Sequence, residues 1–437
     1  MTHFDLETIR SRFPSLSTTD NGVPRIYLDN PAGTQVVQGV AQRMYDCLLE
    51  ASANLGGYFR TSKRAVAIVH DAHDAMADLL NAPSGDEILF GQNMTTLTLQ
   101  VSRSIGRRLE AGDEIILSRM DHDANVTPWV LLARDLELKV RWLPFNLETY
   151  EFDLKALDDL LNERTRLVCV GGASNLTGTI HDIKTICSRA REAGAWSYID
   201  AVQSVPHLAT DVQEIGCDFL ACSAYKFFGP HQGILWGRRE VLESLEPYKV
   251  RPAPKEIPGA FETGTQSHEG MAGTAAAVDY FAWIGQTMAG ADILQRNKRY
   301  AAGRRRYAHA AMDCLFEYET QLSRHLIAGL TSLPAVTVHG ICGAEAMARR
   351  VPTVTFTAAG SASADIAAAL AEQNIFVWSG HNYAVEAAMA LGIYDRGGGV
   401  RVGPVHYNST AELDQLLNAL EGVLPRVKAL ASTRKTL

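Results

Sequence analysis

The side chain of Lys226 has surroundings that could make it chemically reactive. It lies in the segment 223–230, between tyrosine, phenylalanine, glycine and proline residues. Such neighbours exclude water, and desolvation favours the neutral amine, which is a nucleophile toward aldehydes. An acidic residue, Asp200, ends an apolar run upstream. A buried lysine that forms a Schiff base and an acid that pairs with a pyridinium nitrogen are the two halves of a pyridoxal phosphate site.

Either residue alone has a commoner explanation. Most lysines are solvated surface groups, and an aspartate at a strand end often caps a turn or helix. The pair gains weight from its place in the chain, because Asp200 and the segment 223–226 each follow an expected strand. Strand ends of an open parallel sheet converge on the ligand-binding crevice.

Short strands rich in valine and isoleucine alternate with helical patterns through the middle of the chain, which predicts an α/β fold with a mostly parallel sheet. The expected strands are 114–117, 138–143, 166–171, 196–200, 217–222 and 233–236.

The pattern changes after about residue 285, which predicts a second, smaller α+β domain. There we expect a long helix over 291–330, strands over 351–356 and 375–378, and helices over 363–372 and 411–424. The expected organisation is an N-terminal arm (1–25) that packs with the small domain, a large domain (26–285) and a small domain (286–437).

Composition excludes several functional classes. The formal net charge of -8 argues against a nucleic-acid partner. We interpret the basic run 304–306 as a solvated helix face. No apolar run is long enough for a membrane span and the N-terminus has no signal-peptide pattern, so we expect no membrane association and a cytoplasmic location. Seven cysteines without a Cys-x-x-Cys pair predict neither a disulfide framework nor a metal site.

Several motifs, in a consistent order, resemble the class V aminotransferase family of pyridoxal phosphate enzymes of fold type I, and within it the cysteine desulfurase and selenocysteine lyase branch. The resemblance extends over nearly the whole chain, from 9–14 to 407–410. The motifs that carry it are 27–33, 121–129, 174–179, 200–203, 223–230, 261–266 and 400–403.

The resemblance implies a role for each cofactor-binding residue. It places His122 over the cofactor ring, Asp200 at the pyridine nitrogen, and Asn175 and Gln203 near the phenolic oxygen. It assigns the aldehyde carbon to Lys226, and phosphate binding to Ser223 and Tyr225, with Tyr225 standing where desulfurases usually have histidine. The segment Asn93, Met94 and Thr95 precedes a helical pattern whose backbone N–H groups suit a phosphate, although Met94 removes one hydroxyl of the family pair. We expect Lys226, His122 and Asp200 to be the catalytic residues.

Two further implications concern the substrate and the assembly. Thr265 lies in a segment that resembles the one by which a neighbouring subunit reaches the phosphate, which implies a homodimer with shared sites. Arg401 resembles the family arginine whose planar fork pairs with an amino-acid carboxylate. We expect Arg401, Tyr383 and Asn175 to contact a small amino-acid substrate.

The resemblance fails at one decisive loop. The desulfurase cysteine that accepts sulfur is replaced by Tyr383, and the arginine preceding that loop is replaced by Trp378. A phenol cannot hold a persulfide. We therefore expect a pyridoxal phosphate enzyme with lyase or aminotransferase chemistry that forms no persulfide.

Other interpretations stay open. They are a genuine cysteine desulfurase or selenocysteine lyase, an amino-acid epimerase, and a scaffold that binds the cofactor without turnover. A nucleotide-dependent oxidoreductase is disfavoured because no G-x-G-x-x-G motif is present.

Overall fold

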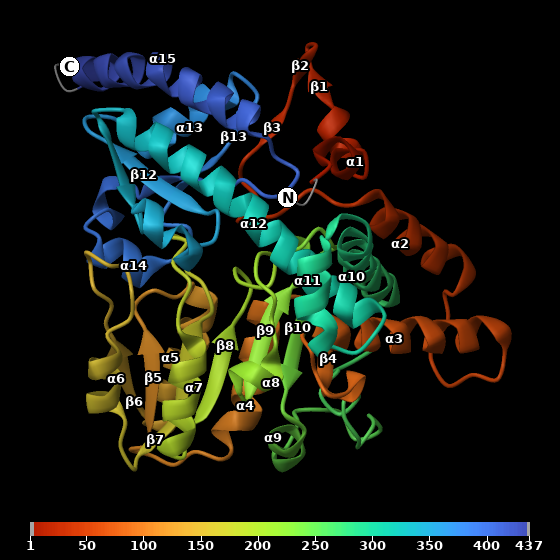
Figure 1. Cartoon of the computed structure of the whole chain (residues 1–437). Coiled ribbons are helices and arrows are strands. Elements are labelled where there is room, and N and C mark those ends of the chain that lie inside the picture. Colours follow the sequence, from red (N-terminus) through yellow and green to blue (C-terminus); the bar gives the residue numbers. More distant parts are fainter. Residues whose placement is uncertain (1–3, 435–437) are drawn as a thin grey trace.

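The computed structural model describes residues 4–434, and its two larger sheets are stacked end to end (Figure 1). The larger sheet has seven strands in the order β4-β10-β9-β8-β7-β5-β6. Five neighbouring strands, from β9 to β6, are parallel, whereas β10 runs antiparallel to both of its neighbours. The strand bounds are β4 Ile88–Gly91, β5 Glu114–Ser118, β6 Lys139–Leu143, β7 Thr165–Gly171, β8 Trp196–Asp200, β9 Phe219–Ser223 and β10 Gly233–Gly237.

Helices cover both faces of this sheet, which explains why its central strands are apolar throughout rather than alternating. Along β8, Ile199 packs into one core with helices α3, α7, α10 and α12 (Arg304–Ser332), while Tyr198 packs into a second core with α4, α5 and α9. The helices of this part are α2 Gln38–Glu50, α3 Arg60–Leu79, α4 Met94–Gly106, α5 Thr127–Leu136, α6 Leu154–Leu160, α7 Ile183–Glu192, α8 Val212–Ile215, α9 Arg239–Ser244 and α10 His268–Met288.

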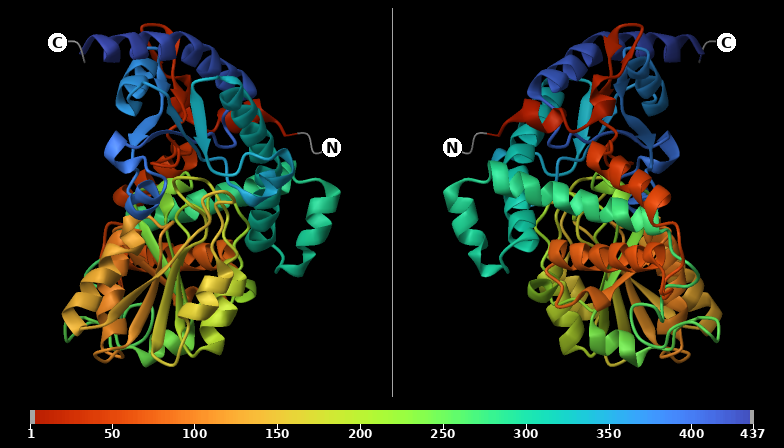
Figure 2. Two further views of the ribbon diagram at one scale, coloured as in Figure 1. Left: turned by 90° about the vertical axis from the view of Figure 1, so that its left-hand side faces the viewer. Right: turned by 90° about the vertical axis from the view of Figure 1, so that its right-hand side faces the viewer.

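The smaller sheet is antiparallel, in the order β11-β12-β15-β14. Its strands are β11 Val336–His339, β12 Val354–Ala358, β14 Trp378–Gly380 and β15 Gly399–Val402. Helices α13 Ser363–Ala371, α14 Val385–Ala390 and α15 Thr410–Arg434 accompany it, and a separate apolar cluster forms its core. Figure 2 shows this part above the open end of the larger sheet.

The N-terminal segment contacts both parts. From α1 (Leu6–Arg10), Ile9 is buried in the core of the larger sheet, while Arg10 donates to Glu412 of α15 at 2.9 Å. Further along, β1 Thr19–Asp20 and β2 Val23–Pro24 form a hairpin, and β3 Ile26–Tyr27 pairs in parallel with β13 Ile375–Phe376. The division at residues 25 and 285 stays a prediction.

The prediction of a single long helix over 291–330 was wrong. The chain forms α11 (Ala291–Arg296) and α12 (Arg304–Ser332), separated by a short turn. Gly303 has a φ of 101°, a conformation that only glycine adopts readily. The buried Asn297 amide also donates to the Ile293 carbonyl at 3.0 Å, which fixes the turn.

In addition, β4, β10 and β11 lie antiparallel to a neighbour, a pairing that the strand patterns did not predict.

The prediction of a solvated helix face at 304–306 was also wrong. Arg304 pairs with Asp71 and Asp78 of α3 and with Asp279 of α10, at 2.8 to 3.4 Å. Arg305 joins the same cluster through Asp78. The basic run therefore lies half-buried between three helices, where acidic partners replace water.

Within residues 4–434, no helix is long and apolar enough to cross a membrane.

The crossing of α10 and α12 gives a first test of the packing. A Cβ added at Gly285 of α10 would lie 1.8 Å from the backbone oxygen of Tyr307 in α12, so the two helices would have to separate. We expect Gly285→Ala to lower the free energy of unfolding by roughly 1–3 kcal/mol, measured by urea denaturation.

Gly422 of α15 is the matched control, since a Cβ there meets no atom within 4 Å. Gly422→Ala should leave stability unchanged or raise it by up to about 1 kcal/mol. Equal effects of the two substitutions would contradict this account of the helix crossing.

Candidate active site

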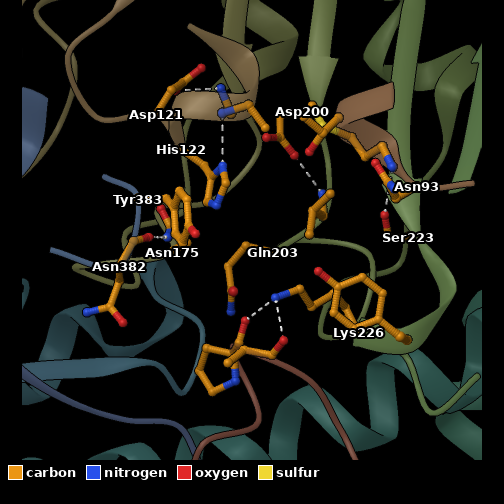
Figure 3. Close-up of a pocket in the computed structure, with 18 of the residues that line it drawn as sticks. Asn93, Asp121, His122, Asn175, Asp200, Gln203, Ser223, Lys226, Asn382 and Tyr383 are labelled. Atoms are coloured by element: carbon orange, nitrogen blue, oxygen red, sulfur yellow. Dashed lines mark hydrogen bonds between the residues drawn. The ribbon is translucent and has the colours of Figure 1, made fainter. Parts of the chain in front are cut away.

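A cavity of about 410 Å³ lies where the parallel strands of the larger sheet end and the smaller sheet faces them. Residues at or just after the ends of β5, β7, β8 and β9 form one wall, and residues of β14, β15 and the loop after β14 form the other. Figure 3 shows their side chains converging. The polar and aromatic residues that line the cavity are Asn93, Thr95, Asp121, His122, Asn175, Asp200, Gln203, Ser223, Tyr225, Lys226, His231, Trp378, Asn382, Tyr383 and Arg401.

Lys226 projects into this cavity from the turn that follows β9. Its Nζ donates to the backbone oxygens of Pro31 at 2.6 Å and Ala32 at 3.0 Å. Burial, assisted by the positive charge of Arg401, lowers the pKa of Lys226 to about 7. The side chain is therefore held in position while its amine becomes neutral near physiological pH.

Asp200 ends β8 and is fixed by the Val202 N–H, which donates to its Oδ1 at 2.9 Å. Desolvation raises the pKa of Asp200 to about 6, so its charged form lacks a cationic partner within the protein strong enough to offset burial. A carboxyl group in this state is suited to a ligand that brings its own positively charged N–H.

A second buried acid, Asp121, lies close to Asp200. It accepts hydrogen bonds from the Gly171 N–H at 2.9 Å, from the Asn125 amide at 2.6 Å and from the Ser118 hydroxyl. Desolvation raises its pKa to about 7, and the charge of Asp200 adds to the effect. Asp121 therefore ties the turn that carries His122 to the end of β7.

The cavity has an end suited to an anion. Helix α4 begins at Met94 with Asn93 as its cap, and its first backbone N–H groups point out of the helix end. The Met94 N–H donates to the Ser223 hydroxyl at 3.0 Å. This approach requires glycine at 233, because a Cβ there would lie 2.4 Å from the backbone of Asn93.

Two rings complete this end of the cavity. Tyr225 and His231 are stacked with ring centres 4.9 Å apart. Together with Ser223 and the start of α4, they offer hydroxyl, ring N–H and backbone N–H donors. This set of donors fits a phosphate group.

His122 forms an aromatic wall with Tyr383. The Ala124 N–H donates to His122 Nδ1 at 3.0 Å, which leaves the ring proton on Nε2 when the imidazole is neutral. Burial lowers the pKa of His122 to about 3, and the charges of Lys226 and Arg401 act in the same direction. The ring of Tyr383 lies 5.3 Å from that of His122 at an angle of 16°.

Arg401 comes from β15 and is 4% exposed. Its Nη1 donates to the Asn175 backbone oxygen at 3.1 Å, and its Nη2 lies 3.7 Å from Asp29 Oδ1. Its Nε is buried with no hydrogen-bond partner, and so is Asn175 Oδ1. Buried polar groups are normally paired, so these two atoms mark places for a ligand.

The structure thus brings together all but one of the residues singled out from the sequence. Thr265 lies outside the cavity of its own chain, in a surface hollow with Cys47, Ser52 and Gln266. Gln203 lines the cavity and donates to Thr353 Oγ1 at 2.8 Å, which links it to the segment before β12.

Sequence reasoning missed several lining residues. No role was assigned to Asp121, His231 or Asn382, and Asp29 was not connected with Arg401. Asp121 follows β5 as Asp200 ends β8, so the rule that placed Asp200 applies to it as well. The pairing of Asp29 with Arg401 joins residues 372 positions apart and left no local pattern in the sequence.

Comparison with known proteins gives consistent results. The family described as aminotransferase class-V matches residues 26–303 and 302–416 of this chain. An aminotransferase-like protein of Gibberella zeae is 33% identical over 430 residues, which cover 96% of this chain and 99% of that protein. A cysteine desulfurase of Yersinia pestis bv. Antiqua is 29% identical over 436 residues, with 96% and 98% covered.

A solved structure is also similar. The apo cysteine desulfurase from Thermococcus onnurineus NA1 superimposes with a TM-score of 0.84 at 26% identity, and the match covers 97% of this chain and 100% of that one.

The lowered pKa of Lys226 predicts unusual reactivity toward a simple aldehyde. At pH 7 roughly half of its amine is neutral, whereas an exposed lysine with a pKa of about 10.4 has fewer than about one neutral amine in a thousand. In protein freed of small ligands, brief treatment with formaldehyde and cyanoborohydride should therefore methylate Lys226 first.

Labelling of Lys226 should fall as the pH drops through about 7, because protonation removes the nucleophile. Peptide mass spectrometry over pH 5.5–9 measures this, with the other lysines as internal controls. Labelling of Lys226 that rises only above pH 9 would contradict the assigned environment.

Proposed function

Because the chain belongs to the class V aminotransferase family, and is therefore a pyridoxal phosphate-dependent enzyme of fold type I, we propose that it transforms a free amino acid at the Lys226 site without forming a persulfide. The observation that carries the proposal is the side chain at the cavity rim: Tyr383 lines the cavity, and within residues 4–434 no cysteine does. Six of the cysteines are buried, and Cys342 is exposed elsewhere.

The residues present fit the cofactor. The start of α4, Ser223, Tyr225 and His231 would hold its phosphate, and Asp200 its ring nitrogen. Asn175, whose buried Oδ1 has no hydrogen-bond partner, and Gln203 line the same cavity and would contact the cofactor. When bound, pyridoxal phosphate supplies an electron sink that makes the bonds at the substrate α-carbon labile.

The protein's own groups then determine the outcome. Arg401 would hold the substrate carboxylate through its unpaired Nε, while the Asp29 carboxylate lies 3.7 Å from its Nη2. The neutral Nζ of Lys226 is the group placed to take a proton from the substrate and return it. His122, neutral with its proton on Nε2, would stack on the cofactor ring and exclude water from it.

Lyase and aminotransferase chemistry both agree with this arrangement. The relative from Gibberella zeae is named as aminotransferase-like, which supports the second of these. A desulfurase, a selenocysteine lyase, an epimerase and a scaffold are the other outcomes of the experiment below.

We also propose a homodimer in which Thr265 reaches the phosphate of the partner's site. Its place outside its own cavity supports this assignment. An exposed apolar surface on α2 and the loop after it supports a subunit contact, since large apolar surfaces usually mark an interface. Its members are Tyr45, Leu48, Leu49, Leu55, Tyr58 and Phe59.

Turnover of cysteine tests the absence of persulfide chemistry. Wild-type holoenzyme incubated with cysteine should release no alanine above the level of Lys226→Ala, and mass spectrometry should detect no protein-bound persulfide. Tyr383→Phe should behave in the same way, because neither side chain can accept sulfur. Tyr383→Cys supplies a thiol at the rim and should gain persulfide.

A wild-type enzyme that forms alanine and persulfide at equal rates would refute the proposal. A keto acid formed while the amino group passes to an added second keto acid would indicate an aminotransferase, and loss of a β-substituent with release of ammonia a lyase. Inversion alone would indicate an epimerase, and no turnover of any amino acid a scaffold.

Arg401 gives a separate test of substrate binding. Losing one partner of a buried charge pair costs roughly 2–5 kcal/mol, so Arg401→Ala should raise KM between about 30-fold and several thousand-fold. Arg401→Lys should recover little, since an ammonium cannot reproduce the planar fork.

The control is Arg426→Ala, which removes an exposed ion pair with Glu372 on the far side of the smaller sheet. It should leave KM at the wild-type value. An unchanged KM in both Arg401 variants would mean that the carboxylate is bound elsewhere.

A further inference from the structure

Two large aromatic side chains at the mouth of the cavity are left uncovered. Trp378 is 56% exposed and Tyr383 is 66% exposed, and both line the cavity that contains Lys226 and Arg401. Other large aromatic residues nearby, such as Trp129 and Tyr198, are fully buried. Exposed aromatic surface next to convergent polar groups is typical of a ligand-binding pocket.

Trp378 has a fixed relation to the residue that would bind the substrate carboxylate. Strands β14 and β15 are antiparallel, and Trp378 lies directly opposite Arg401 in their register. Opposite residues on such a pair project from the same face with Cβ atoms about 4.5–5.5 Å apart. A molecule held by Arg401 therefore lies next to the Trp378 ring.

Tyr383 is held rigidly. Asn382 and Tyr383 have φ angles of 52° and 59°, in the left-handed region. The Asn175 amide donates to the Asn382 backbone oxygen, and the Asp123 N–H to that of Tyr383, both at 2.7 Å. These bonds, with the stacking on His122, keep the phenol ring at the rim.

The acidic residues around the cavity are all engaged within the protein. Among the described lining residues, the acids are Asp121 and Asp200, which lie at the strand ends and accept hydrogen bonds there. Asp29 is next to Arg401, and Glu386, which follows the rim loop, is paired with Arg119. A cationic substrate side chain would therefore find no free carboxylate beside Trp378 and Tyr383.

We propose that Trp378 and Tyr383 form a specificity pocket for a flat, uncharged side chain, so that the substrates are amino acids with an aromatic side chain. This inference rests on the proposed function, because it takes Arg401 as the carboxylate site. The ring of the substrate packs against Trp378, and Tyr383 bounds it on the side of His122.

Binding to the holoenzyme tests the proposal without requiring turnover. Changes in the visible absorbance of the bound cofactor are titrated with L-phenylalanine, L-alanine, L-cysteine and L-lysine. Wild type should bind phenylalanine at least about tenfold more tightly than alanine, cysteine or lysine, the size expected of one good aromatic contact plus its buried area. Trp378→Ala should bring the ratio of phenylalanine to alanine affinity close to one.

Two further variants separate packing from general damage. Trp378→Phe keeps a flat ring and should restore most of the ratio. Leu147→Ala removes an equally exposed apolar side chain outside the cavity and should keep the wild-type ratio.

The outcomes are distinguishable. If wild type binds alanine, cysteine or lysine as tightly as phenylalanine, or if Trp378→Ala keeps the ratio, the specificity pocket is refuted while the proposed function stands. If Trp378→Ala changes the oligomeric state instead of the ratio, Trp378 belongs to a subunit contact and the proposal is overturned. If no amino acid alters the absorbance, the proposed function itself fails.

Discussion

The loop between β7 and α7 holds the two walls of the cavity together. Three of its backbone oxygens accept hydrogen bonds from the other wall. The Asn175 oxygen accepts from the Arg401 guanidinium, the Leu176 oxygen from the Thr355 hydroxyl and the Gly178 oxygen from the Val351 N–H. Gly178 has a φ of 76°, and a Cβ there would lie 2.3 Å from the Thr353 oxygen. Buried polar contacts of this kind specify one arrangement, because any shift leaves several groups unpaired at once. The position of Arg401 relative to Lys226 and His122 on the opposite wall depends on this loop.

Burial of the ionisable residues in the cavity explains the electrostatics of the site. Desolvation is the largest cause of the low pKa values of Lys226 and His122 and of the raised pKa values of Asp121 and Asp200. Burial disfavours the charged form of every group, so it acts in opposite directions on bases and acids. Burial therefore makes the neutral amine of Lys226 available as a base, and it favours cationic partners for Asp121 and Asp200.

Much of this arrangement was predictable from local sequence. Lys226, Asp200 and Ser223 lie at the ends of apolar strands, and the carboxyl ends of parallel strands meet at one edge of the sheet. The family assignment and the α/β fold were confirmed by the matches over almost the whole chain. The antiparallel pairing of β10 was not predictable, since a fully buried strand has the same composition in either direction. The burial of Arg304 and Arg305 depends on acids in two other helices, and a run of arginines contains no information about them.

Helix α12 also limits how the molecule can move. Its 29 residues extend for about 44 Å. Its first half, around Ala308 and Leu315, is part of the core of the larger sheet, and its second half, around Leu326, is part of the core of the smaller one. A rigid element embedded in both cores opposes hinge rotation, because turning one part would pull packed side chains out of the other. We therefore expect the two sheets to keep a constant separation throughout the catalytic cycle.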